Sequence, residues 1–500
     1  MKKNSILKSM LSVSGIVLLS KALGFVKQMI TAKYFGATIQ TDLISISEGL
    51  ITNLDYLLVQ ALSTAFIPTY LAVSNTREND TKRFVSDCIK VFFLITAAVS
   101  AVVFAASPLV AKILAPSYSP ETSAQLAKYI RILTPVFILV TEMALFNSLL
   151  KANKSFVPGE LIGFNHSVIV IVLVFVIGQT FGADTLIVAF IAYAAFNLLF
   201  LALLSRKYWS IQPSGKPFLS EDVKQLLRMM GPLILGYSLV FVNQQVDKII
   251  VSGLGDGVVT AMSYAAVLSN FITTLVGSLC SVIFTYVTQH IVKGEDDAAA
   301  GLTVSSCIQM VTLLLPVSIL TILNTEDIVT VVFGRGRFDQ TAVANCSYAL
   351  IGYAMMFVPV VIRELFSRYQ YGYGDSKRPM INSSVSIGIN IVLSILLSRF
   401  WGVLGVTVAT SFSILACAVL NVISSKRYHG GLKLRLAARY LPRWIIGAAI
   451  CVVVTLAGRQ WLTGLHAVLR FLIIVVISFA GYGAVTISIL KPLLKRLRNR

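Results

Sequence analysis

The sequence is poor in charged residues and contains few cysteines and histidines. Only 13% of its 500 residues are charged, 56% are hydrophobic, and the mean hydropathy is +0.81. A soluble protein uses roughly 25% charged residues to cover its surface. Much of this protein's surface must therefore face lipid, which excludes an ordinary soluble enzyme or binding domain.

The cysteines and histidines are too scattered to indicate a metal centre. The six cysteines stand singly in or beside apolar segments without a CxxC pair, and the four histidines show no HxxxH spacing. Isolated cysteines of this kind are expected to be small buried hydrophobic residues. We therefore predict neither a metal site nor a disulfide framework, and no cofactor.

The alternation of apolar and polar residues that marks a membrane β-barrel strand is also missing. Runs such as 168–177 (VIVIVLVFVI) and 311–323 (VTLLLPVSILTIL) are almost continuously apolar. Because lipid cannot hydrogen-bond to the backbone, such runs cross the bilayer as helices. We predict an all-α polytopic membrane protein with about fourteen transmembrane helices. The predicted spans are 10–33, 42–73, 84–113, 126–150, 157–180, 184–205, 224–252, 257–291, 300–324, 343–371, 378–399, 403–425, 441–459 and 467–490.

The net charge of +20 does not indicate a nucleic-acid partner, because the basic residues lie in short loops between apolar runs. Alternate loops are rich in lysine and arginine, as at 206–228 and 426–443. The intervening loops hold few, namely Arg335, Arg337, Arg399, Arg459 and Arg470. The positive-inside rule therefore predicts that both termini lie in the cytoplasm. The sequence leaves the oligomeric state open.

An internal repeat divides the chain. Residues 151–208 begin with KANKSFVPGELIGF and end in SRKY, while residues 372–428 begin with GYGDSKRPMINSSV and end in SKRY. Six helices per copy give the two copies the same orientation, as in transporters built from parallel repeats. The predicted domains are an N-lobe (1–208), a cytoplasmic linker (209–223), a C-lobe (224–428), two extra helices (441–490) and a basic cytoplasmic tail (491–500).

Two glycine-rich motifs, GLGDG (253–257) and GRGRFD (334–339), superficially resemble phosphate-binding loops. Neither follows a strand or has the full spacing of such a loop. We predict that both are turns at the outer face.

Several charges fall inside predicted spans, where a charge usually faces a cavity or a partner. Lys21 and Lys27 share the first span with no acidic residue, which points to an anionic ligand such as a phosphate. Structural ion pairs or snorkelling side chains are the favoured interpretation of Glu48, Glu142, Asp247, Lys248 and Arg368. Arg363 is the next candidate cation, because it lies well inside a span of the second repeat.

The segments 11–42, 62–71, 246–271, 333–343 and 369–379 together resemble the MurJ (MviN-type) lipid II flippases. These flippases belong to the multidrug/oligosaccharidyl-lipid/polysaccharide exporter superfamily. The resemblance covers essentially the whole chain in order. It implies two six-helix lobes, two extra helices that form a lipid-facing groove, and a location in the bacterial cytoplasmic membrane.

The resemblance also implies functional residues. Lys21 and Lys27 stand where the family has substrate-binding arginines, and Asp42 matches an acidic position of the family. A further cavity arginine of the family's helix 2 would fall near Leu54 or Asp55 here, and neither residue is cationic. Lysine keeps the charge of arginine but loses its two-pronged hydrogen bonding. The sequence departs from the family's charged positions further along, where it has Ala266, Val267 and Asn270.

We therefore expect a flippase, not an enzyme, that moves an undecaprenyl-diphosphate-linked saccharide to the outer leaflet. The family resemblance favours lipid II as the substrate, whereas the missing charges favour a polysaccharide repeat unit. An ion-coupled drug exporter and a membrane glycosyltransferase are the other classes considered. The first would favour membrane carboxylates over paired lysines, and the second usually needs a long catalytic loop. Membrane potential and an ion gradient both remain open as the driving force.

Overall fold

The computed structural model describes residues 3–77, 80–210, 219–428, 432, 435–462 and 467–498. Side chains are described between Gly15 and Ile489, with gaps around 78–79, 211–218, 429–437 and 463–468. Most of the predicted linker 209–223 and the side chains of the tail 491–500 lie outside this part of the chain. The described residues form helices and turns, which confirms the all-α class.

The chain folds into two compact units, residues 1–260 with 335–338, and residues 261–334 with 339–500. The described helices that lie in the first unit are α1 (Lys3–Phe35), α2 (Ile39–Thr76), α3 (Thr81–Ala105), α4 (Ser107–Leu114), α5 (Pro120–Leu133), α6 (Val136–Ala152), α7 (Val157–Phe181), α8 (Thr185–Ser205) and α9 (Glu221–Ser252), with short 3-10 turns at Gly182–Asp184 and Arg206–Tyr208. Within this unit, α1 packs on α7, and α2 packs on both α6 and α9.

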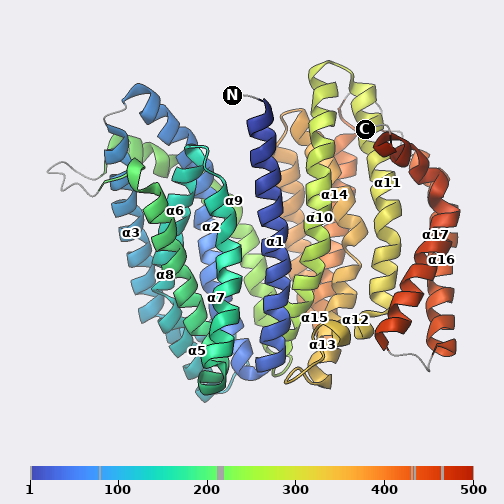
Figure 1. The fold of residues 1–500 in the computed structure, drawn as a ribbon, viewed down its shortest axis with the longest axis horizontal. Helices are drawn as coiled ribbons and strands as arrows, with labels where there is room; N and C mark the ends of the chain where they lie inside the picture. The colour runs from blue at the N-terminus through green and yellow to red at the C-terminus, as the bar shows by residue number, and fades with distance from the viewer. Residues whose placement is uncertain are drawn as a thin grey trace. The chain divides into compact units, whose positions relative to one another are not determined.

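The second unit takes in most of α10 (Val258–Val292) and the remaining helices. These are α11 (Asp296–Leu323), α12 (Thr325–Val332), α13 (Gln340–Ala354), α14 (Phe357–Gly372), α15 (Lys377–Ser425), α16 (Arg435–Trp461) and α17 (Ala467–Arg498). Here α14 packs on α15, and α16 pairs with α17 (Figure 1). Phe357 and Val361 of α14 pack with Cys280 of α10 and Met310 of α11 in a buried apolar cluster.

Local sequence signals place several helix starts. Thr38 begins α2 with a capping box, in which its hydroxyl accepts the Thr41 amide and the Thr41 hydroxyl accepts the Thr38 amide. Ser220 and Asp339 accept backbone amides at the starts of α9 and α13. Such caps satisfy N–H groups that the first helical turn leaves unpaired.

Twelve helical segments of the described chain are long and apolar enough to cross a membrane. Two of them, 157–208 and 377–425, contain two spans each, which brings the number of crossings to fourteen and confirms the prediction. The division falls at Gly182 (φ 58°) and Gly402 (φ 55°), which are related by the same offset as the sequence repeat. The paired helices α5–α6 and α13–α14 follow the same offset. The domain boundaries proposed from the repeat stay a prediction, because compact packing and sequence repetition are different properties.

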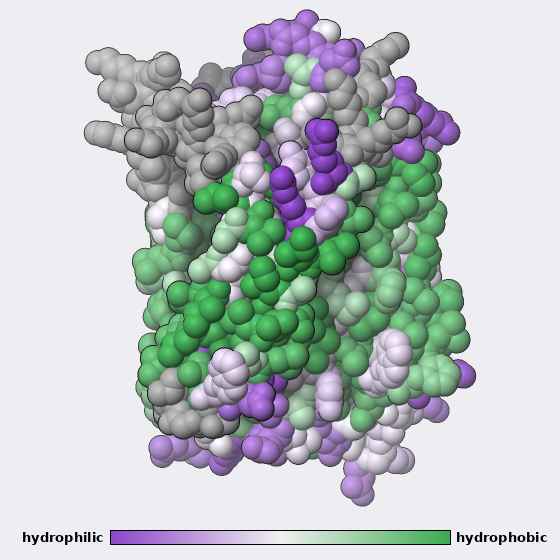
Figure 2. Space-filling view, turned by 90° about the vertical axis from the view of Figure 1, so that its right-hand side faces the viewer, coloured by the Kyte–Doolittle hydropathy of each residue, from purple (hydrophilic) through white to green (hydrophobic). Residues whose placement is uncertain are grey.

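The second unit presents an apolar surface suited to lipid. Ile445 and Val453 of α16 and Val476 of α17 are each at least 60% exposed. Figure 2 shows a hydrophobic belt on this side, with hydrophilic residues gathered toward both ends. The cysteines behave as predicted, because all six are free thiols and only Cys307 is less than fully buried.

Candidate functional site

Three ionisable side chains of the first unit lie close enough to interact electrostatically. They are Lys27 of α1, Glu48 of α2 and Lys248 of α9, and both lysines lie within electrostatic reach of the Glu48 carboxylate. The Lys248 ammonium donates a hydrogen bond to the Ser45 carbonyl oxygen at 3.0 Å. It lies against Gly49, where any side chain would collide with it. A side chain at position 49 would therefore require the end of the Lys248 side chain to move.

This lysine–glutamate cluster contains two ammonium groups and one carboxylate. All three groups lie in membrane-spanning segments and are partly buried. Uncompensated charge is costly at such depth, so an excess of positive charge there is suited to an anionic ligand. The arrangement can bind an anion through charge-assisted hydrogen bonds.

Polar rings border this cluster. The His166 ring of α7 contacts the Tyr193 ring of α8 in a tilted arrangement, with centroids 4.3 Å apart, and His166 lies within electrostatic reach of Lys27. Asp55 of α2 lies within similar reach of Tyr193. The Asp55 Oδ1 atom is buried and has no hydrogen-bond partner among the described residues, so it can accept a hydrogen bond from a ligand.

Lys21 and Arg363 are two further predicted site residues. Lys21 is exposed on α1, six residues before Lys27. Arg363 lies on α14 in the second unit, where its guanidinium contacts Glu364 Oε1 at 2.7 Å. Arg368 contacts the other oxygen of Glu364 at 3.4 Å, so this group also carries one excess positive charge.

Asp42 has a structural task in this conformation. Its side chain is fully buried. Its two oxygens accept hydrogen bonds from the Gly257 and Thr260 amides, each at 2.7 Å. The carboxylate thus caps the first turn of α10, where a negative charge is favourable. The predicted contact between Asp42 and substrate stays a prediction.

Both glycine-rich motifs form turns, as predicted, and both rest against the corner between α1 and α2. Gly257 (φ +79°) lies against the Ala37 carbonyl, and Gly336 (φ +66°) lies against the Lys33 carbonyl, so neither position has room for a side chain. The Arg337 amide donates to the Lys33 carbonyl at 3.0 Å. Glycine is needed because the turns combine a left-handed backbone with a close approach.

The second unit has an apolar cavity of about 470 Å³ between α16 and the helices α11, α14 and α15. Its lining includes Ile308, Ile362, Phe366, Leu441 and Trp444. The Trp444 ring N–H donates to the Thr312 hydroxyl at 2.9 Å, which fixes the ring against α11. The cavity is lined by apolar side chains, and its lining residues Ile362 and Phe366 flank Arg363 in sequence.

The sequence placed Lys27, Glu48 and Lys248 inside predicted spans but did not show that they lie close together. The interpretation of Glu48 and Lys248 as structural ion-pair charges stays a prediction, and their electrostatic interaction is compatible with it. The sequence did not show that α9 packs on α2. This packing brings Glu48 and Lys248, which are 200 positions apart, close together.

Comparisons with known proteins agree with this architecture. A family model described as "Lipid II flippase MurJ" matches residues 31–477. A "Probable lipid II flippase MurJ" of Buchnera aphidicola is 26% identical over 442 residues, covering 85% of this chain and 84% of that protein. A "Lipid II flippase MurJ" of Burkholderia cenocepacia is 24% identical and covers 78% of this chain and 77% of its own length.

Solved structures show the same fold. One described as "Lipid II flippase MurJ, inward closed conformation" has a TM-score of 0.82 at 19% identity and covers 97% of this chain and 100% of its own. An inward-facing multidrug resistance MATE family transporter of the MOP superfamily has a TM-score of 0.63 at 12% identity, covering 81% of this chain and 94% of its own.

Proposed function

This chain belongs to the lipid II flippase MurJ family, and we propose that it moves lipid II from the cytoplasmic to the outer leaflet of the bacterial cytoplasmic membrane. The observation that carries the proposal is the family match over residues 31–477, which spans both units. The site geometry supports it with a cationic cluster for a diphosphate and an apolar cavity for a prenyl chain.

The diphosphate is proposed to bind beside Lys27 and Lys248. Glu48 neutralises one of the two ammonium groups and leaves the other for the ligand. Lys21 adds a second cation on α1, exposed for a first contact with the headgroup. Asp55 supplies an unpartnered carboxylate oxygen that suits a saccharide hydroxyl. Arg363, held by Glu364, is proposed as the cationic contact of the second unit.

The prenyl chain is proposed to bind in the cavity between α16 and α11, α14 and α15. That cavity is lined almost wholly by apolar side chains. Moving one methylene group from water into an apolar site contributes about 0.8 kcal/mol. A prenyl chain that is already in lipid does not gain this energy. It therefore gains affinity in the cavity only where part of it leaves water or fills space that lipid fills poorly.

An interior-negative membrane potential is proposed to assist the outward movement of the anionic headgroup. The gain is about 2.3 kcal/mol per charge per 100 mV. Both termini are proposed to lie in the cytoplasm, because the positive-inside rule assigns the loops rich in lysine and arginine to that side.

The experiment that tests the function uses the purified full chain in proteoliposomes. Lipid II is compared with an undecaprenyl-diphosphate saccharide that lacks the peptide, such as a polysaccharide repeat unit. We expect lipid II to cross the bilayer faster than in protein-free liposomes, and the repeat unit to cross more slowly. Faster transport of the repeat unit would instead favour polysaccharide export, in keeping with Ala266, Val267 and Asn270.

A further inference from the structure

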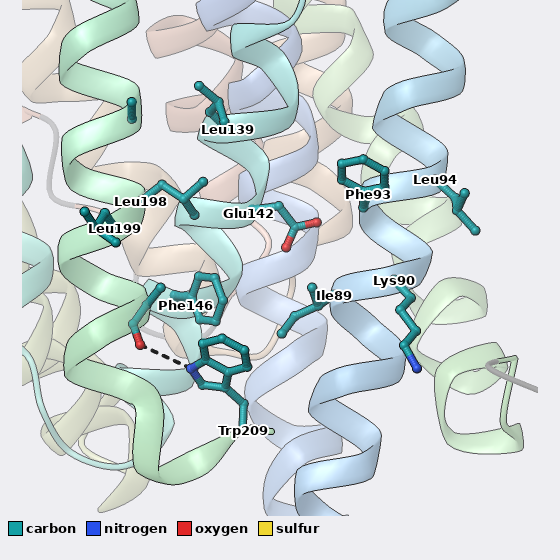
Figure 3. Close-up of a pocket in the computed structure, with 12 residues that line it drawn as sticks. Ile89, Lys90, Phe93, Leu94, Leu139, Glu142, Phe146, Leu198, Leu199 and Trp209 are labelled. Atoms are coloured by element: carbon teal, nitrogen blue, oxygen red, sulfur yellow. Dashed lines mark hydrogen bonds between the residues drawn. The ribbon is translucent and has the colours of Figure 1, made fainter. Parts of the chain in front are cut away.

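One cavity of the first unit lies away from the lysine–glutamate cluster. It has a volume of about 780 Å³ and lies between α3, α6 and α8 (Figure 3). Its walls are apolar side chains, including Phe93, Leu139, Phe146 and Leu199. Neither Lys27, Glu48 nor Lys248 lines it, so it is separate from the site proposed for the diphosphate.

One carboxylate points into this apolar space. Glu142 of α6 lines the cavity and is only 6% exposed. Neither of its side-chain oxygens has a hydrogen-bond partner among the described residues. Burying a carboxylate without a partner is expensive, and such groups in proteins normally have a counter-ion or a donor. A positively charged ligand would provide the counter-ion.

The cavity's own lysine does not fill this role. Lys90 of α3 also lines the cavity, but its charge acts on Asp87, one turn earlier on the same helix. Figure 3 shows the Lys90 ammonium directed away from the Glu142 carboxylate, which lies among Ile89, Phe93 and Phe146. On α8, the cavity is lined by apolar residues such as Ala195 and Leu198.

A ligand would reach the cavity from the bilayer. Phe93 and Leu94 of α3 are each 50% exposed and Leu199 of α8 is 60% exposed, and all three belong to membrane-spanning segments. The side chains that border the cavity are therefore in contact with lipid. A ligand that is dissolved in the membrane and carries a large apolar body matches this entrance.

We propose that the cavity between α3, α6 and α8 binds a membrane-dissolved amphiphile with a cationic ammonium or phosphonium centre, and that Glu142 is its counter-ion. The apolar body of the ligand contacts Phe93, Leu139 and Leu199, while its positive centre lies against the carboxylate. The chemistry is opposite in sign to the diphosphate site, because there the protein provides the cations. This inference goes beyond the proposed flippase function and does not rest on it.

The test measures equilibrium binding of radiolabelled tetraphenylphosphonium to the full chain in phosphatidylcholine nanodiscs, with protein-free nanodiscs subtracted. Triphenylphosphine oxide, which is neutral and similarly apolar, is the matched probe. We expect the native protein to bind the cation at least tenfold more tightly than the neutral probe. Glu142→Gln keeps the size of the side chain and should reduce that preference at least tenfold.

Two further variants identify the location of the bound probe. Ala195→Phe fills part of the cavity with Glu142 intact and should weaken cation binding, whereas Glu160→Gln removes a glutamate elsewhere and should not. Thermal unfolding of each variant establishes that it is folded. The proposal fails if the native protein binds no more cation than empty nanodiscs, if Glu142→Gln binds it equally well, or if Ala195→Phe leaves binding unchanged.

Discussion

The Thr260 amide donates a hydrogen bond to Asp42 Oδ1 at 2.7 Å, across 218 residues of sequence. Together with the bond from Gly257, it ties the start of α10 to the start of α2. Because the buried Asp42 carboxylate accepts two backbone hydrogen bonds, it holds the turn that contains Gly257 in one position. Asp42 therefore acts on the architecture of the first unit in this conformation.

Replacing Asp42 should destabilise this junction. Asp42→Asn keeps one oxygen but turns an amide N–H₂ group toward a backbone N–H, which leaves a buried donor unsatisfied. We expect a loss of about 1–3 kcal/mol in the free energy of unfolding, seen as a lower midpoint of thermal unfolding. Asp256→Asn, an exposed acid in the same turn, is the control. Equal midpoints for the two variants would contradict a capping role.

The charge of Lys27 should matter more than its packing. Lys27→Arg keeps the positive charge and should retain most lipid II binding. Lys27→Gln removes the charge and should weaken binding about ten- to a hundredfold, since a hydrogen bond to a charged group contributes about 1.5–3 kcal/mol. The level of each variant in the membrane is checked first. Lipid II binding is then measured with the purified protein, and transport is measured by complementation in cells.

The same pair of changes at Lys21 should behave alike, while Lys112→Gln, an exposed lysine of α4, should have no effect. If Lys21→Gln and Lys27→Gln are both well expressed and fully active, the cationic site lies elsewhere. Arg363 would then be the next residue to replace.

The proposed topology makes a prediction about labelling. A cysteine at Arg335 should react with a membrane-impermeant reagent in intact cells, and a cysteine at Lys426 should react only after lysis. The native cysteines give little background because five are buried and the sixth is partly buried. A reporter active only outside the cytoplasm, fused to Arg500, should give no signal. The reverse labelling pattern would show that the proposed membrane topology is inverted.

The tyrosine that ends the SKRY repeat motif should make stability depend on pH. The Tyr428 hydroxyl donates to Asp375 Oδ2 at 2.7 Å, and this bond, together with the Arg378 amide, lowers the pKa of the Asp375 carboxyl. A carboxyl whose pKa is lowered by folding contributes stability above its unfolded pKa of about 4. That contribution is lost as the pH falls through the folded value.

Tyr428→Phe removes the hydroxyl and should raise the pKa of Asp375 toward its ordinary value. The variant should therefore be less stable than the native protein at pH 7, and the difference should shrink at pH 3.5. Thermal unfolding at the two values measures this, with Tyr371→Phe of α14 as the control. A deficit that is equal at both values would show that the hydroxyl does not act through Asp375.

The membrane class, the fourteen spans and the repeat were predictable because each follows from local sequence. A bilayer requires about twenty apolar residues per helix, and this length can be read from one segment at a time. The helix divisions at Gly182 and Gly402 show that the repeat extends to backbone geometry. The turns at 253–257 and 334–339 were likewise predictable from their glycines.

The partners of the intramembrane charges were decided only by the tertiary structure. Sequence alone placed Lys27, Glu48 and Lys248 inside spans. Which of these charges interact depends on which faces of the helices are in contact. Here α2 packs on α9, although nearly 200 residues separate them in the chain. The tertiary structure likewise gives Asp42 two backbone donors from the start of α10 and leaves the Glu142 side chain of α6 with none among the described residues, although both are single acids in apolar surroundings. The cost of burying a charge is set by its neighbours in space, so the apolar sequence around each acid predicts its burial and not its partner.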